Sequence, residues 1–367
     1  MLNQISETLL MGPGPSTVTK SVLDALAKPT IGHLDPRFIE IMDHVKSMLR
    51  TVFETSNALT MPISGTGSAG MEATFVNLVE PGDRVLVLVN GVFGKRMQDV
   101  ATRLGAEVTT VEFEWGTPVR PEQVQTALVD GTFDLVAVVH AETSTGVRNP
   151  IEEIAALVEG SGALFVVDTV TSLGGIPVTV DAWKADAVYS GTQKCLSCPP
   201  GLAPLTFSDR AQARLDRRTR PVPNWYLDLS LLTSYWEGAK RSYHHTAPIN
   251  MIYALHQALE NVLEEGLAAA HTRHHEAHER LAAGLPELGL SLFVEPEYRL
   301  PMLNAVTVPQ GVDEATVRRR LLEEFDIEIG AGLGPLAGKI WRVGLMGESA
   351  REHHVDRLLE ALRTILR

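Results

Sequence analysis

The chain of 367 residues has few cysteines and fewer basic than acidic side chains. Its 32 lysines and arginines against 45 aspartates and glutamates leave a net charge of -13, which argues against nucleic acid or an anionic membrane as a partner. No apolar run is long enough to span a bilayer, and the first ten residues lack the basic start and apolar core of a secretion signal. We therefore expect a cytoplasmic protein.

The only two cysteines, Cys195 and Cys198, form a C-x-x-C motif. Such a motif can be a redox pair or half of a zinc site. Because no second cysteine pair exists, we expect neither a redox nor a metal function.

Continuous apolar runs at residues 84–89, 135–139, 164–167 and 187–190 alternate with helix-like stretches. Runs of this kind are typical of strands that are covered on both faces, so we expect an α/β fold with a mostly parallel sheet. Ligands in this architecture bind at the carboxyl ends of the strands. The length predicts a second domain as well.

The last third of the chain predicts that second domain. Residues 250–285 have the apolar spacing of one long helix, which we expect to bridge the domains. Strands at 303–308 and 340–343 then alternate with helices at 316–325 and 351–366, which predicts a small α+β domain.

Two residues at predicted strand ends suggest the chemistry. Asp168 follows the apolar run that begins at Ala163, and Lys194 follows the strand at 187–190 through small polar residues. Pyridoxal phosphate (PLP) needs a lysine amine for its Schiff base and a carboxylate beside its pyridine nitrogen. The alternative is that Asp168 caps a turn and Lys194 is solvated.

A glycine-rich segment offers an anion site. Residues 65–70 read G-x-G-x-x-G, and a helix-like stretch at 71–78 follows, so backbone amides could bind an anion. We do not expect NAD binding, because Met61-Pro62-Ile63 is a poor strand. The hydroxyls of Thr66 and Ser68 favour a single phosphate.

Other polar residues leave alternatives open. Arg342 lies in an apolar strand, where it could clamp a carboxylate or form a structural ion pair. The turn at 11–16 could be structural or could let a substrate approach the backbone. His271, His274, His275 and His278 are expected to form a solvated helix face, whereas the Tyr243-His244-His245-Thr246 loop could contact an anion.

Taken together, the motifs resemble those of class V aminotransferases, and more narrowly the alanine/serine–glyoxylate aminotransferases of PLP fold type I. The resemblance covers nearly the whole chain. It rests on seven motifs, namely Gly12-Pro13-Gly14-Pro15, Ser64-Gly65-Thr66-Gly67, Glu142-Thr143-Ser144-Thr145-Gly146, Asp168-x-x-x-Ser172, Ser190-Gly191-Thr192-Gln193-Lys194, Tyr243-His244-His245-Thr246 and Arg342-x-Gly.

The resemblance implies a role for each site residue. Lys194 would form the Schiff base and Asp168 would pair with the pyridinium. The phosphate would be held by Thr66, Gly67, Ser68 and Gln193. Around the ring and substrate it places Thr143 near the ring hydroxyl, Phe93 where relatives often carry a stacked tryptophan, Ser172 behind the pyridine, Gly14 near the substrate and Arg342 on its carboxylate.

The resemblance also implies an assembly and a reaction. Tyr243 and Thr246 would reach the neighbouring subunit's cofactor, so we expect a homodimer with composite sites. The domains would be an arm at 1–15, a PLP-binding domain at 16–265 and a small domain at 266–367.

The expected reaction is ping-pong transfer from alanine or serine to glyoxylate. Serine–pyruvate and ureidoglycine–glyoxylate transfer remain alternatives. Relatives in the ureidoglycine branch tend to carry amide side chains at the positions of His33 and Tyr243, so the absence of amides there disfavours that branch. A cysteine desulfurase is less expected, since no cysteine follows Cys198.

Overall fold

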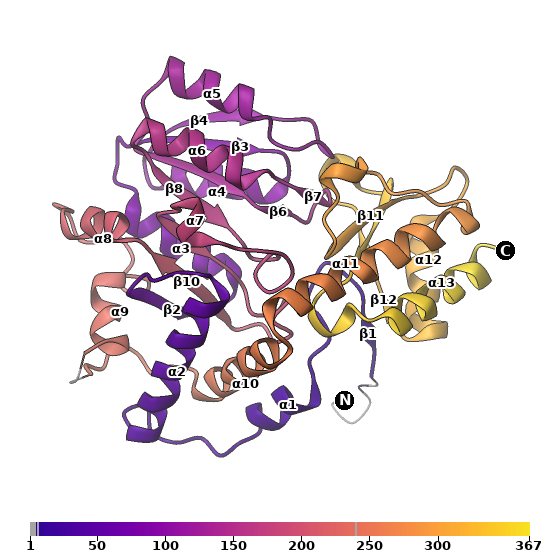
Figure 1. The fold of residues 1–367 in the computed structure, drawn as a ribbon, viewed down its shortest axis with the longest axis horizontal. Coiled ribbons are helices and arrows are strands. Elements are labelled where there is room, and N and C mark those ends of the chain that lie inside the picture. Colours follow the sequence, from indigo (N-terminus) through magenta and orange to yellow (C-terminus); the bar gives the residue numbers. More distant parts are fainter. Residues whose placement is uncertain (1–4, 6, 239–240) are drawn as a thin grey trace.

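A computed structural model describes residues 5, 7–238 and 241–367. Figure 1 shows a large sheet domain beside a smaller domain. The large sheet has seven strands, and the five from β9 to β4 are parallel, whereas β10 is antiparallel to both of its neighbours. In sheet order the strands are β2 (Leu59–Ser64), β10 (Leu202–Phe207), β9 (Ala187–Tyr189), β8 (Leu164–Asp168), β5 (Leu135–Val139), β3 (Arg84–Val89) and β4 (Glu107–Glu112).

The strands are apolar because helices cover the sheet on both faces. Helices α3 (Gly67–Leu78) and α4 (Val92–Arg103) contact each other and pack on the sheet. A second group of contacting helices, which also packs on the sheet, consists of α5 (Pro121–Asp130), α6 (Ile151–Ser161) and α7 (Val180–Trp183). Further helices of this part are α1 (Lys20–Leu26), α2 (Pro36–Val52), α8 (Asp209–Asp216) and α9 (Leu229–Trp236). The predicted α/β class with a mostly parallel sheet is confirmed.

One strand differs from the expectation. Met61, Pro62 and Ile63 lie within β2 at the sheet edge and pair with β10, so their description as a poor strand was wrong. Proline is tolerated on an edge strand because its missing N–H costs no ladder bond there.

The smaller domain has its own hydrophobic cluster, separate from that of the large sheet. Its antiparallel sheet consists of β11 (Leu303–Thr307), β14 (Ile340–Gly344) and β13 (Gly330–Ala331), with α12 (Glu314–Phe325) and α13 (Glu352–Ile365) packed nearby. The N-terminal strand β1 (Leu9–Leu10) pairs with β12 (Ile327–Glu328), so the start of the chain joins this cluster.

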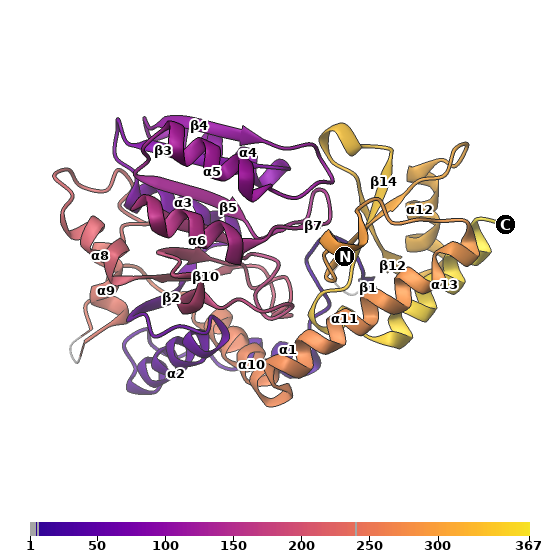
Figure 2. The same ribbon diagram turned by 45° about the horizontal axis from the view of Figure 1, so that its top comes forward.

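Two helices connect the domains where one was expected. The predicted helix 250–285 is broken into α10 (Ile249–Glu265) and α11 (Leu267–Gly284) by Gly266, whose φ of 84° a helix cannot accommodate. Helix α10 packs on α1 and α2, whereas α11 packs on α13, and Figure 2 shows the pair running from one domain to the other.

Candidate active site

A cavity of about 210 Å³ lies at the carboxyl ends of β5, β8 and β9, beside the starts of α3 and α4. This is the edge at which parallel α/β sheets bind ligands. Seven of the predicted site residues line it, namely Gly67, Ser68, Phe93, Thr143, Asp168, Gln193 and Lys194.

Lys194 lies on the loop after β9, where its amine donates a hydrogen bond to the carbonyl of Pro13. Burial, followed by the charge of Arg342, lowers the pKa of Lys194 to about 8. Gly14 has a φ of 108°, and a Cβ there would collide with the lysine side chain. The N-terminal turn is therefore a wall of the site, and its glycine leaves room for Lys194.

Asp168 ends β8 with its carboxylate in the cavity, where it accepts a hydrogen bond of 2.8 Å from the Val170 amide. Burial raises its pKa to about 6. Tyr189 neighbours it across the β8–β9 pairing, and its buried hydroxyl lacks a hydrogen bond of normal geometry. Asp168 is still largely ionised at neutral pH, as a partner for a cationic ring nitrogen must be.

The start of α3 offers an anion cradle. Thr66 is its N-cap residue, Gly67 and Ser68 form its first turn, and no acidic side chain lies in that turn. A Cβ on Gly67 would press on Val170, so the glycine brings the backbone close to the cavity wall. The Oε1 atom of Gln193 is buried without a partner. The free backbone amides and the hydroxyls of Thr66 and Ser68 at this helix start are donors that suit a phosphate, whereas Gln193 Oε1 is an acceptor.

Arg342, in β14, is buried and donates hydrogen bonds to the carbonyls of Ala331 (2.6 Å) and Thr143 (3.3 Å). Burial lowers its pKa to about 10, so it remains charged. Among the described residues no carboxylate forms an ion pair with it, which argues against the structural ion pair considered above. Its charge is free for an anionic ligand.

Six predicted residues lie outside the cavity lining: Gly14, Thr66 and Arg342, which border the site, and Ser172, Tyr243 and Thr246. Tyr243 and Thr246 are exposed and contact each other at 3.3 Å, and the Tyr243 ring lies 5.0 Å from that of His33. The Oγ atom of Ser172 is buried without a partner on the loop after β8.

Sequence reasoning missed three residues at this site, Arg96, Tyr189 and Glu142. The Arg96 guanidinium lies 4.8 Å from the centre of the Phe93 ring, and the spacing of three residues in a helix could have indicated this contact. Tyr189 ends the strand that leads to Lys194. Glu142, fully buried, caps α4 as described below.

The cysteines and histidines have structural surroundings. Burial raises the pKa of both thiols to about 12, so neither Cys195 nor Cys198 is a ready thiolate. The expectation of a solvated histidine face was wrong, because His274 and His278 are buried. His274 accepts a hydrogen bond from the Gly347 amide and faces the Ala270 carbonyl. Nowhere in the described residues do three potential metal ligands gather.

The profile of the family described as "Aminotransferase class-V" matches residues 9–345. The chain belongs to the class-V aminotransferases. A relative of this class-V aminotransferase, the (S)-ureidoglycine–glyoxylate transaminase of Bacillus subtilis (strain 168), is 41% identical over 97% of the chain and 90% of the relative. The alanine–glyoxylate aminotransferase of Drosophila melanogaster is 41% identical over 96% and 91%.

A solved structure agrees with these relatives. The alanine–glyoxylate aminotransferase of Nostoc sp. is 52% identical and superposes with a TM-score of 0.97, covering 99% of this chain and 96% of that one. The class-V aminotransferase therefore has the PLP fold type I architecture predicted from its motifs. No helix among its described residues is long and apolar enough to cross a membrane.

The family implies PLP as cofactor, and the residues present fit it. The cavity supplies an amine of lowered pKa, a buried carboxylate and an anion cradle at a helix start. The buried polar atoms without partners include the Tyr189 hydroxyl and Gln193 Oε1, both in the cavity lining. Buried polar groups are rarely left unpaired, so these atoms indicate a polar ligand.

Proposed function

We propose that the chain is a PLP-dependent aminotransferase that moves the amino group of alanine or serine to glyoxylate by a ping-pong mechanism, giving glycine and pyruvate or hydroxypyruvate. The observation that carries this proposal is one cavity lined by Lys194 and Asp168, with Arg342 beside it, bonded to the lining residue Thr143 and without an ion pair among the described residues. The alanine–glyoxylate aminotransferases among the relatives support the choice of substrates.

The bound cofactor would supply an aldehyde for covalent attachment and a ring that withdraws electrons from the substrate carbon. Lys194 Nζ, neutral in part at pH 7–8, would hold that aldehyde and, once released, move the substrate's α-proton. Asp168 would keep the ring nitrogen protonated. Arg342 would bind the substrate carboxylate through its free guanidinium edge.

The remaining predicted residues would hold the cofactor. Thr66, Gly67, Ser68 and Gln193 would bind the phosphate at the start of α3. The Phe93 ring would cover one face of the cofactor, with less hydrogen-bonding capacity than an indole. Thr143 would lie near the ring hydroxyl, Ser172 behind the pyridine, and Gly14 beside the substrate.

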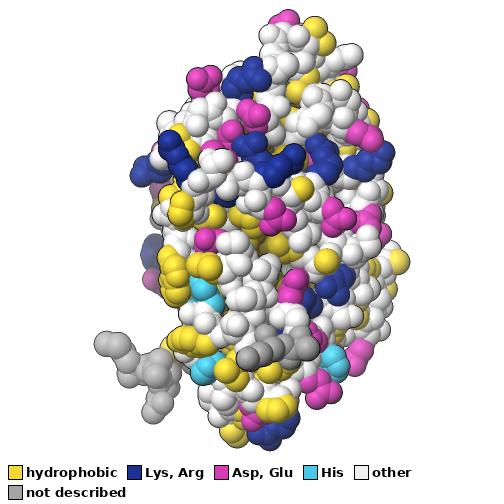
Figure 3. Space-filling model, turned by 90° about the vertical axis from the view of Figure 1, so that its left-hand side faces the viewer, with side chains coloured by type: hydrophobic (Ala, Val, Ile, Leu, Met, Phe, Trp, Pro, Cys, Tyr) yellow, Lys and Arg dark blue, Asp and Glu magenta, His cyan; other side chains and the backbone are white. Residues whose placement is uncertain are grey.

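A homodimer with composite sites is also proposed. Tyr243 and Thr246 point to solvent, as residues that complete a neighbour's site would. The segment around α9 exposes Trp225, Tyr226 and Leu231, and Figure 3 shows hydrophobic and histidine side chains on the side where α8 and α9 lie. Exposed patches of this kind are typical of interfaces.

The domain division 1–15, 16–265 and 266–367 remains our proposal, and so does a cytoplasmic location. The two largest hydrophobic clusters, one in each part, and the break at Gly266 support that division.

Ureidoglycine–glyoxylate transfer is the second candidate, because the Bacillus subtilis relative is as similar to this chain, at 41% identity, as the Drosophila melanogaster alanine–glyoxylate enzyme, although the Nostoc enzyme is more similar at 52%. Against it, His33 and Tyr243 are not the amides that the family resemblance leads us to expect in that branch. Serine–pyruvate transfer differs only in its acceptor.

Two measurements test the proposal. Purified enzyme should bind PLP with a yellow absorbance that Lys194→Ala abolishes, together with about a 10³-fold loss of activity or more. A panel of alanine, serine and ureidoglycine against glyoxylate and pyruvate should show the highest kcat/KM for alanine or serine with glyoxylate. An unchanged absorbance in Lys194→Ala would contradict the role of Lys194 in binding the cofactor. A preference for ureidoglycine would contradict alanine or serine as the amino donor.

A further inference from the structure

The N-terminus of α4 has an unusual cap. Its N-cap residue is Gly91, which has no side chain to accept from the free amides of the first turn. Those amides instead donate to another segment: Val92 N to Ser144 Oγ at 3.0 Å, and Phe93 N and Gly94 N to Glu142 Oε2 at 3.1 and 3.4 Å. A buried carboxylate about 50 residues away in sequence thus replaces the usual local cap.

Both oxygens of Glu142 are engaged. Oε1 accepts from the amide and the hydroxyl of Ser144, and Oε2 accepts from the helix. Gly91 has extended backbone that any residue could adopt, but a Cβ there would collide with the Glu142 carboxyl group and with Ser144 Oγ. The glycine is needed for this close approach, and so the sequence is adapted to the cap on both sides.

The two segments joined by this cap both line the cavity. Helix α4 carries Phe93 and Arg96, which line the cavity and stack on each other. The turn between β6 (Ala141–Glu142) and β7 (Val147–Arg148) carries Thr143, whose carbonyl accepts a hydrogen bond from Arg342. A shift of one segment against the other would therefore move Phe93 relative to Arg342.

A simple structural cap does not require this carboxylate. An exposed serine or aspartate caps a helix at little cost, whereas burial makes the charge of Glu142 costly and raises its pKa to about 7. Asp168, whose charge contributes to that rise, and Arg342, which is stabilised by the Glu142 charge, both belong to the site.

We propose that Glu142 is a positioning residue for transamination, which fixes Phe93 on the cofactor face and Arg342 at the substrate carboxylate by holding α4 against the 141–148 hairpin. The proposal rests on the function proposed above. It assigns Glu142 no contact with substrate or cofactor.

The test is Glu142→Gln, because a carboxamide of the same shape can accept hydrogen bonds on one side only. Its matched control is Glu122→Gln, an exposed glutamate in the first turn of α5. We expect about a tenfold weaker equilibrium affinity of the apoenzyme for PLP, a changed visible circular dichroism of the bound cofactor, and about a tenfold higher KM for the amino donor, with the Lys194-dependent absorbance retained. The control should leave all three unchanged.

A purely structural cap would give another pattern. Glu142→Gln would then lower the melting temperature while PLP affinity, circular dichroism and KM stayed at wild-type values, and that result would overturn the proposal. Ser144→Ala removes only the hydrogen bonds of the hydroxyl, so PLP affinity, circular dichroism and KM should change in the same direction but by less. This variant provides the test if Glu142→Gln does not fold. If wild-type protein binds no PLP, the proposed function itself fails, independently of this comparison of variants.

Discussion

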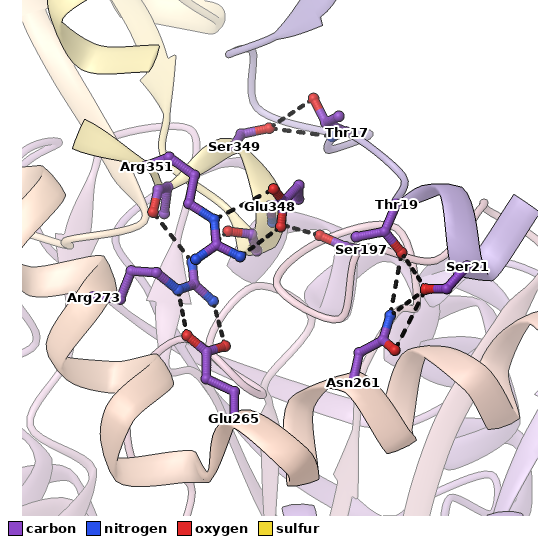
Figure 4. Close-up of polar contacts among 12 residues, drawn as sticks. Thr17, Thr19, Ser21, Ser197, Asn261, Glu265, Arg273, Glu348, Ser349 and Arg351 are labelled. Carbon is purple, nitrogen blue, oxygen red and sulfur yellow. Dashed lines mark hydrogen bonds and ion pairs between the residues drawn. The ribbon is translucent and has the colours of Figure 1, made fainter. Parts of the chain in front are cut away.

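Two polar clusters lie on either side of the loop that carries Lys194, and their hydrogen bonding differs. At the cavity, the lining residue Lys194 and the neighbouring Arg342 lack an ion-pair partner among the described residues, and the buried Tyr189 hydroxyl and Gln193 Oε1 have no hydrogen bond of normal geometry. On the other side, only three residues from Lys194, Ser197 begins a junction between the domains (Figure 4).

The junction is fully paired by contrast. Arg273 binds both carboxylate oxygens of Glu265 and also donates to the carbonyl of Gly347, while Arg351 pairs with Glu348. The Glu348 amide donates to Ser197 Oγ at 2.7 Å. None of the buried unpaired atoms in the described residues belongs to this junction. Several buried unpaired atoms that line one cavity are typical of a site that a ligand completes, whereas a fully paired cluster is typical of a structural junction.

Of the substitutions compared here, Asp168→Asn should lower the activity of the cavity site most. A carboxamide cannot balance a cationic ring nitrogen, so we expect kcat to fall by about 10²–10³-fold while the yellow absorbance due to Lys194 remains. Steady-state kinetics with alanine and glyoxylate, together with the absorbance spectrum, measure this. A loss of less than tenfold would mean that Asp168 is not the partner of the ring nitrogen.

Arginines from the two clusters provide the next comparison. Arg342→Gln keeps a donor for the neighbouring carbonyls but loses the charge, and we expect about 2 kcal/mol, or roughly 30-fold, lower kcat/KM, mainly through KM. Arg351→Gln at the junction should stay within about twofold, because its charge pairs with Glu348 and not with a ligand. Equal effects of the two changes would remove the distinction between the clusters.

The pH dependence of cofactor binding tests Lys194, which has no ion-pair partner among the described residues. Only the neutral amine reacts with an aldehyde, so PLP incorporation into the apoenzyme should accelerate about tenfold between pH 7 and 9, with a midpoint near the pKa of about 8. A solvated lysine would continue to gain rate up to its ordinary pKa of 10.5. Stopped-flow absorbance measures the midpoint, and a value above about 9.5 would show that burial does not lower this pKa.

The sequence predicted the parts of this site that follow local rules. Asp168 and Lys194 follow apolar strands, and the strand order alone brings them to one sheet edge. Helix breaking at Gly266 was missed because the apolar spacing continues on both sides of the glycine. The burial of His274 and the cap formed by Glu142 depend on contacts with Gly347 and with α4 that are distant in sequence, and no local pattern encodes them.

Glu265→Gln should give the smallest effect, confined to stability. Its hydrogen bonds with Arg273 lower the pKa of Glu265, so the carboxylate stabilises the folded state above its unfolded pKa and loses that contribution as the pH falls through the lower folded value. We expect about 1 kcal/mol lower unfolding free energy at pH 7, a difference that shrinks below about pH 4, and activity within about twofold. Because Arg273 also holds the Gly347 loop behind Lys194, a large loss of kcat at unchanged stability would show that the junction takes part in the chemistry and that pairing alone does not separate structure from function.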